Sequence, residues 1–318
     1  MIERSKSPPS HHRICPKHQN YLVTMAEFED ITDAERVQIA QHFLLNSPPA
    51  QYGLVSEDVK KLLPEGCLPE AVESGIAKTY NFKNCRVVKT PLGGLVALHK
   101  DGEVNESHSI DTSNGAVFKI NHLTMETSEG DEGVVSNQDS SLELKRAAMQ
   151  ADVDAYIKEK FPCDAAAGSV YAKDGALTIA ITGERVNLRN MYSGKWNSQF
   201  IVRGFSGDKT ATLSGDIKVH NHYFEEGNIQ MQTAKPVSAK EISFSSEKDL
   251  AEKIIAAITE VEQETQKALH FIVNTAHVST LKELRKASTV HKVKMAWNKN
   301  AAKMVGQLTG KSQDSAPK

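Results

Sequence analysis

Residues 168–244 restrict the possible folds more strongly than any other part of the sequence. Five β-patterned segments follow one another here, separated by Asp174-Gly175 and by other Gly-containing turns. Turns this short can join antiparallel strands but not parallel ones, which need long crossover connections. The region therefore predicts a five-stranded antiparallel meander. Its segments are SVYAK, ALTIAIT, WNSQFIVRGF, TATLSGDIKVHNHYF and NIQMQTA.

The residues after the meander change from a β period to a helical one. From Leu250 to Ile272 the apolar positions step by three or four residues, which predicts a helix of about seven turns with one apolar stripe. A helix of that length can cross a whole sheet, so the two elements together predict α+β layering. An earlier stripe, from Leu142 to Phe161, predicts another helix that ends at Pro162.

The N-terminal part of the chain predicts helices and no strands. Residues 1–25 are rich in Ser, Pro, His and Lys without periodicity, so we expect a disordered extension. Residues 26–80 then predict a helical stalk of three short helices. The first begins at a capping box formed by Thr32 and Glu35, the second begins at Ser56-Glu57-Asp58, and the third spans Leu68 to Lys78.

Residues 81–140 predict a small β globule followed by a linker. Short β-branched runs end at Gly-Gly, Asp-Gly and Asn-Gly turns, and residues 126–139 are rich in Ser, Glu, Asp and Gly. The β runs of this region are CRVVKT, GLVALHK and AVFKINHL.

The remaining boundaries place a helix, the antiparallel sheet and its covering helix in 141–278, and a C-terminal tail in 279–318.

Charge separates this tail from the rest of the chain. The whole protein has a formal charge of −2, but residues 279–318 contain nine Lys or Arg and two acids. The net +7 of the tail therefore stands against −9 elsewhere, which indicates a basic arm that seeks an acidic partner. The overall balance excludes a uniformly basic nucleic-acid-binding protein.

The sequence lacks the signals that mark several other classes of protein. No window approaches the roughly 18 apolar residues of a membrane span, and the N-terminus lacks the apolar core of a secretory signal. Four cysteines without CxxC spacing indicate an intracellular, reduced protein. No G-x-S-x-G, HExxH or G-x-G-x-x-G occurs, so nothing favours an enzyme or a bound cofactor.

One histidine pair could bind a metal ion. His220 and His222 share one face of a predicted strand near Glu225 and Glu226, a donor set that zinc accepts. No motif supplies a third ligand, so a polar solvent face or a subunit contact is the simpler interpretation, and we predict no metal.

The tail itself has two interpretations from its pattern. Val290, Val293 and Trp297 begin a stripe at helical spacing, with lysines on another face. Such a stripe is typical of a last helix packed on the core. It also fits a mobile basic amphipathic arm that docks into a partner's groove, and calmodulin or a membrane surface would suit that arm too.

The order and spacing of several motifs resemble the alpha subunit of the heterodimeric F-actin-capping protein family. The similarity runs from about residue 26 to 305, and no single motif carries it. The matching segments are EFEDITDAERVQIAQHFLLNSPPAQYGLVSEDVKKLL (27–63), FKINHL (118–123), MYSGKWNSQF (191–200), HYFEEGNIQ (222–230), LKELRK (281–286) and KVKMAWNK (292–299).

The resemblance implies an architecture and a partner. It implies an α+β fold with an N-terminal helical stalk, a small β globule, an antiparallel β-meander covered by one long helix, and a C-terminal basic amphipathic tail. A capping protein beta subunit would add its strands to the sheet, so we expect an obligate heterodimer. Acidic phosphoinositides and capping-regulator proteins are further partners that the resemblance suggests.

The resemblance also implies a function. The heterodimer would bind the barbed end of an actin filament and block subunit exchange, independently of calcium, in the cytoplasm and its actin cytoskeleton. A scaffold or regulatory subunit with the same dimer fold but poor filament binding is the alternative. The residues expected to bind actin are Lys282, Arg285, Lys286, Lys292, Lys294 and Trp297.

Overall fold

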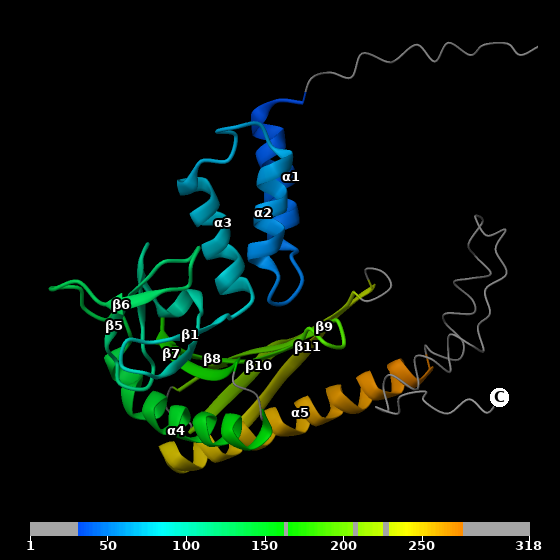
Figure 1. Ribbon diagram of the computed structural model, residues 1–318. Helices are drawn as coiled ribbons and strands as arrows, with labels where there is room; N and C mark the ends of the chain where they lie inside the picture. Colours follow the sequence, from blue (N-terminus) through cyan, green and yellow to red (C-terminus); the bar gives the residue numbers. More distant parts are fainter. Residues whose placement is uncertain (1–30, 162–164, 206–208, 225–228, 276–318) are drawn as a thin grey trace, which may run out of the picture.

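The computed structural model describes residues 31–161, 165–205, 209–224 and 229–275. Its elements form layers: three N-terminal helices lie on one side of a five-stranded sheet, and two further helices lie on the other (Figure 1). The predicted extension 1–25 and the predicted tail 279–318 lie outside the described residues.

The first helix, α1 (Asp33–Leu45), begins where its capping signal predicts. The Thr32 hydroxyl accepts the backbone N–H of Glu35 at 3.3 Å, and the Glu35 carboxylate accepts the Thr32 N–H at 2.9 Å. Two orphan donors of the first turn are thereby satisfied. The predicted capping box is confirmed.

The next two helices have boundaries that differ from the prediction. Helix α2 (Tyr52–Leu62) begins four residues before Ser56, so the predicted start signal lies inside the helix. The Ser56 hydroxyl instead donates a 2.6 Å hydrogen bond to Glu73 of α3 (Glu70–Lys83). Helix α3 also begins after the predicted Leu68 and continues past Lys78. The Ser56 side chain, which could have capped a helix, therefore makes a tertiary hydrogen bond instead.

Six short strands follow in two small sheets. One pairs β1 (Val87–Lys89) with β2 (Leu95–Ala97), and the other has the order β3-β4-β5-β6. The last strand, β6, lies inside the segment predicted to be a linker, which is a correction. The strands of the second sheet are β3 (Glu103–Asn105), β4 (His108–Ile110), β5 (Val117–Ile120) and β6 (Thr127–Glu129).

The large sheet confirms the predicted antiparallel meander. Its strands lie in the order β11-β10-β9-β8-β7, and every neighbouring pair is antiparallel. Asp174 and Gly175 both have positive φ, as the two-residue turn between β7 and β8 requires. The strands are β7 (Ala165–Lys173), β8 (Ala176–Asn187), β9 (Tyr192–Arg203), β10 (Thr210–Tyr223) and β11 (Ile229–Ser243).

Helices α4 (Glu143–Lys160) and α5 (Glu247–Thr275) cover one face of this sheet (Figure 1). Helix α4 approaches β7 so closely that a Cβ on Gly168 would lie 2.2 Å from Val153 Cγ1. The main core forms between the two helices and the strands, and it includes Met149, Ile179 and Leu250, each fully buried.

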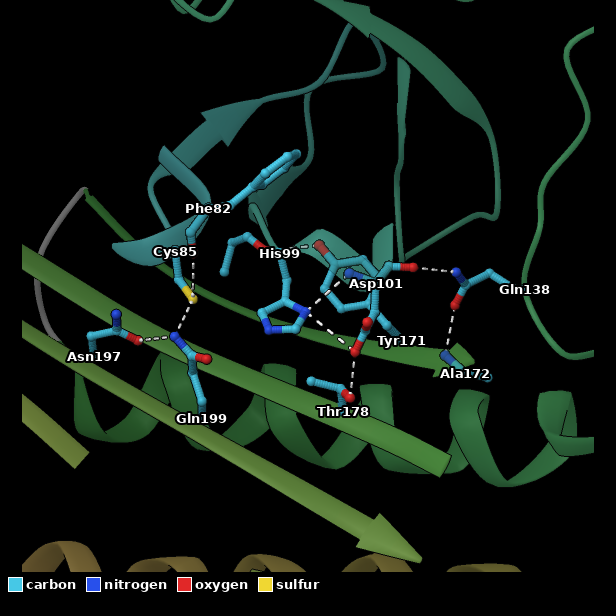
Figure 2. A network of polar contacts seen from close by, with 11 residues as sticks. Phe82, Cys85, His99, Asp101, Gln138, Tyr171, Ala172, Thr178, Asn197 and Gln199 are labelled. Carbon is cyan, nitrogen blue, oxygen red and sulfur yellow. Dashed lines mark hydrogen bonds and ion pairs between the residues drawn. The ribbon is translucent and has the colours of Figure 1, made fainter. Parts of the chain in front are cut away.

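Polar contacts fasten the small strands to the opposite face of the sheet (Figure 2). The Tyr171 hydroxyl of β7 donates to the Ala97 carbonyl oxygen of β2 at 2.7 Å, and the Thr178 hydroxyl of β8 donates to Asp101 at 2.7 Å. The Gln138 amide bridges the Asp101 carbonyl oxygen and the Ala172 N–H. These bonds fix the small β layer on β7 and β8.

Candidate functional site: the open edge of the sheet

Strand β11 is one of the two edge strands of the large sheet, and it is exposed along most of its length, whereas the other edge strand, β7, is largely buried. Among the strands that the structure describes, β11 pairs only with β10. Apart from Ile242, its 15 residues are exposed or half-buried. A strand in this position presents N–H and C=O groups that another chain can bind. It also contains Pro236, a residue that sheets accept mainly at their edges.

Helix α5 lies beside this strand. Lys235 Nζ of β11 is 3.3 Å from Glu264 Oε2, and Lys240 Nζ is 2.9 Å from Glu260 Oε2. These ion pairs are largely exposed, so each contributes little to stability. They show that the strand and the helix form one continuous surface.

The predicted apolar stripe of α5 is buried over only part of its length. Leu250, Ile254 and Ile258 are fully buried against the sheet and α4. Further along, Ile272 is 48% exposed and its neighbour Phe271 is 70% exposed. The stripe therefore extends beyond the core formed by the described residues, which is typical of a surface that a partner covers.

A buried carboxylate fixes α5 on the sheet. Glu262 Oε2 accepts the Tyr156 hydroxyl of α4 at 2.5 Å, and Oε1 accepts the Ser198 hydroxyl at 2.6 Å and the Trp196 indole N–H at 3.2 Å. Burial raises the pKa of Glu262, against the opposing effect of these three hydrogen bonds. One side chain thus joins α4, β9 and α5.

We expect Glu262→Leu to lower the free energy of unfolding by about 2–4 kcal/mol, because the buried hydroxyls of Tyr156 and Ser198 lose their acceptor. Glu262→Gln should change it by no more than about 1 kcal/mol, because both hydroxyls can rotate to suit an amide and the buried charge is removed. Urea unfolding of the purified assembly at pH 7 measures both. Equal losses for the two variants would contradict this role.

A comparison of the wild type with Glu262→Gln also tests the direction of the Glu262 pKa shift. A carboxyl group whose pKa is raised on folding binds protons more readily in the folded than in the unfolded state, so its contribution to stability increases as the pH falls through the raised pKa. The wild type should therefore gain stability relative to Glu262→Gln when the pH is lowered from 7 toward 4.5. A constant difference between the two proteins would contradict this.

The histidine pair of β10 makes contacts within the protein. His222 is buried with its Nδ1 3.0 Å from Gln51 Nε2, and His220 Nε2 lies 3.0 Å from Gln230 Oε1. Glu225 and Glu226 fall in an undescribed gap. In the parts of the chain described above, no three His, Cys, Asp or Glu side chains gather closely enough to hold a metal ion.

The residues expected to bind actin are not among those described. All six follow Thr275, the last described residue, so they stay a prediction. The six residues are Lys282, Arg285, Lys286, Lys292, Lys294 and Trp297.

Glu262 was missed by the sequence reasoning, although its position four residues after Ile258 places it on the buried stripe.

None of the described helices is long and apolar enough to span a bilayer.

The fold and its exposed strand define a protein of mixed helices and antiparallel sheet with a surface suited to a dimer partner. The family model described as "F-actin capping protein alpha subunit" matches residues 40–307. The chain belongs to this family.

Curated relatives and a solved structure agree with this assignment. An F-actin-capping protein subunit alpha from Dictyostelium discoideum is 28% identical over 270 residues, covering 84% of this chain and 95% of the relative. One from Caenorhabditis elegans is 29% identical over 291 residues, covering 87% and 98%. The homodimeric actin capping protein alpha subunit from Plasmodium berghei shares the fold, with a TM-score of 0.66, 21% identity, and 82% of this chain and 99% of that chain covered.

Proposed function

We propose that this chain is the alpha subunit of a heterodimer that binds the barbed end of actin filaments and blocks subunit addition and loss. Membership of the capping-protein alpha family carries the proposal. The family is one of actin-binding proteins rather than enzymes, so the proposed activity is binding alone. The cytoplasmic actin cytoskeleton is where such an activity would operate.

The partner in this proposal is a capping protein beta subunit, and β11 is where it would bind. The exposed strand offers backbone hydrogen bonds, and the exposed end of the α5 stripe offers apolar surface next to it. The solved structure of the Plasmodium berghei relative is described as homodimeric. A second copy of this chain is therefore the competing occupant of the same edge.

The basic tail supplies the contacts with actin in this proposal. Its lysines and arginine would meet acidic groups on the filament end, with Trp297 as an apolar anchor. Acidic phosphoinositides and capping-regulator proteins would be further ligands of the heterodimer. The residues concerned are Lys282, Arg285, Lys286, Lys292, Lys294 and Trp297.

The elongation of pyrene-labelled actin from filament seeds tests this function. We expect the purified heterodimer to stop barbed-end growth at amounts far below that of actin, because one complex blocks one filament end. The effect should be equal in calcium and in a calcium chelator. Inhibition only at amounts close to that of actin, or none at all, would favour a non-capping scaffold with the same dimer fold.

A further inference from the structure

A cavity of about 330 Å³ lies at the junction between the helices and the large sheet. The C-terminal ends of α1 and α3 form one wall, and strands β9, β10 and β11 form the other. This is the face of the sheet opposite α5. The volume is near the lower end of the range for small-molecule sites, about 300–1,000 Å³.

The walls of this cavity are cationic. Lys83, Lys195 and Lys218 line it together with His220, and no Asp or Glu is present among its lining residues in the described part of the chain. The register pairs His220 with Lys195 and Lys218 with Asn197, so strands β9 and β10 direct all four side chains to one face. Amide groups of Asn46 and Asn197 add neutral donors.

Lys195 is the most unusual member of this group. Its side chain is only 5% exposed, and its ion pair among the described residues, with Glu184, is long at 3.5 Å. Burial lowers the pKa of Lys195, Glu184 opposes that effect, and the nearby charge of Arg86 adds to it. A buried ammonium group has three donors, and one long contact satisfies them poorly. A second anion beside it would be stabilising.

The charges around the cavity leave a positive excess. Lys218 Nζ is 2.7 Å from Asp216, and Glu184 pairs with Lys195, but neither carboxylate lines the cavity. Lys83 has no ion-pair partner among the described residues, and the positive charge of Arg86 acts on Lys195. The helix C-termini offer only partial negative charges of about half a unit each.

We propose that this cavity binds a compact phosphate-bearing anion, held by the ammonium groups of Lys83, Lys195 and Lys218. The ligand chemistry is that of one or two closely spaced phosphate groups, because three lysines in a small volume match a multiply charged anion. A soluble phosphorylated molecule or the headgroup of a phosphorylated lipid could supply it. The site is separate from the proposed tail and from the strand β11 backbone.

Calorimetric titration of the purified full-length assembly with inorganic pyrophosphate, without divalent cations, tests the proposal. We expect saturable binding that weakens as salt rises. The variant Lys83→Gln/Lys218→Gln should bind about tenfold more weakly or worse, since each charged hydrogen bond contributes substantially. Lys83 and Lys218 are both exposed, so the variant should fold.

The matched control is Lys89→Gln/Lys158→Gln, which removes two exposed lysines that do not line the cavity. It should bind pyrophosphate within twofold of the wild type. Flotation with phosphatidylcholine vesicles, with and without a phosphatidylinositol bisphosphate, forms the second arm of the experiment. Binding in the vesicle arm alone, lost in the cavity variant, would assign the phosphate to a lipid headgroup.

Two results would overturn the proposal. One is the absence of binding in both arms, which would leave Lys195 and Lys218 as partners of Glu184 and Asp216 only. The other is binding that the cavity variant and the control variant weaken equally, which would indicate general surface charge. Both readouts are independent of capping, so a protein that fails to cap filaments can still bind the anion, and the reverse also holds.

Discussion

Replacing Lys282, Lys286 and Lys292 by Glu is expected to slow the capping of barbed ends about tenfold or more and to leave the melting temperature unchanged. The substitution turns attraction to an acidic surface into repulsion, and charges at the rim of an interface act first on the association rate. Exposed charges contribute little to folding stability. Capping rates in seeded elongation assays, measured beside thermal melting, give both quantities.

A matched charge change separates the tail from net charge. Glu at Lys89, Lys100 and Lys158 makes the same alteration on exposed positions of the body and should slow capping much less. The wild-type rate should fall as salt rises, because screening weakens the attraction. Unchanged capping by the tail variant would remove these lysines from the actin site. A collapsed melting curve would mean that the tail packs as part of the core.

Expression of this chain alone is expected to give aggregates, whereas co-expression with a capping protein beta subunit should give a soluble 1:1 dimer. The exposed strand β11 and the exposed end of the α5 stripe explain the difference, since unpaired edges and apolar patches associate non-specifically. Sedimentation of the soluble fraction measures the stoichiometry.

Two substitutions make this expectation sharper. Ile272→Asp places a charge on the α5 stripe and should lower the yield of dimer several-fold. Leu144→Asp alters an exposed apolar residue on α4, away from β11, and should have no such effect. A folded monomer of the single chain would contradict the obligate heterodimer. A homodimer would favour a second copy of this chain as the occupant of the edge.

Periodicity predicted the large elements of the fold because the core determines them. Strands β7 to β10 and the helices α4 and α5 each bury a face against the same core, so their apolar positions repeat with the period of the element. Strands β3, β4 and β6 have three residues each, too few for a period to emerge. Their pairing depends on neighbours in space, which local pattern does not record.

The sites were less predictable than the fold. The actin-binding residues of the tail came from a resemblance, and they stay a prediction. The cationic cavity was not foreseen, because Lys83 belongs to α3 while Lys195 and Lys218 belong to strands more than a hundred residues later. Glu262 was foreseeable, since an acid on an apolar helical stripe needs buried donors.

The attachment of Glu262 also determines where α5 ends. Sliding the helix along the sheet by one turn, about 5.4 Å, would carry the carboxylate away from Tyr156, Trp196 and Ser198 together. With 29 residues, α5 is about 43 Å long, so Thr275 is held at a set distance from that anchor. The length of the helix therefore fixes the position of Thr275 relative to the sheet. Whatever the following residues bind, they start from this one point on the molecule.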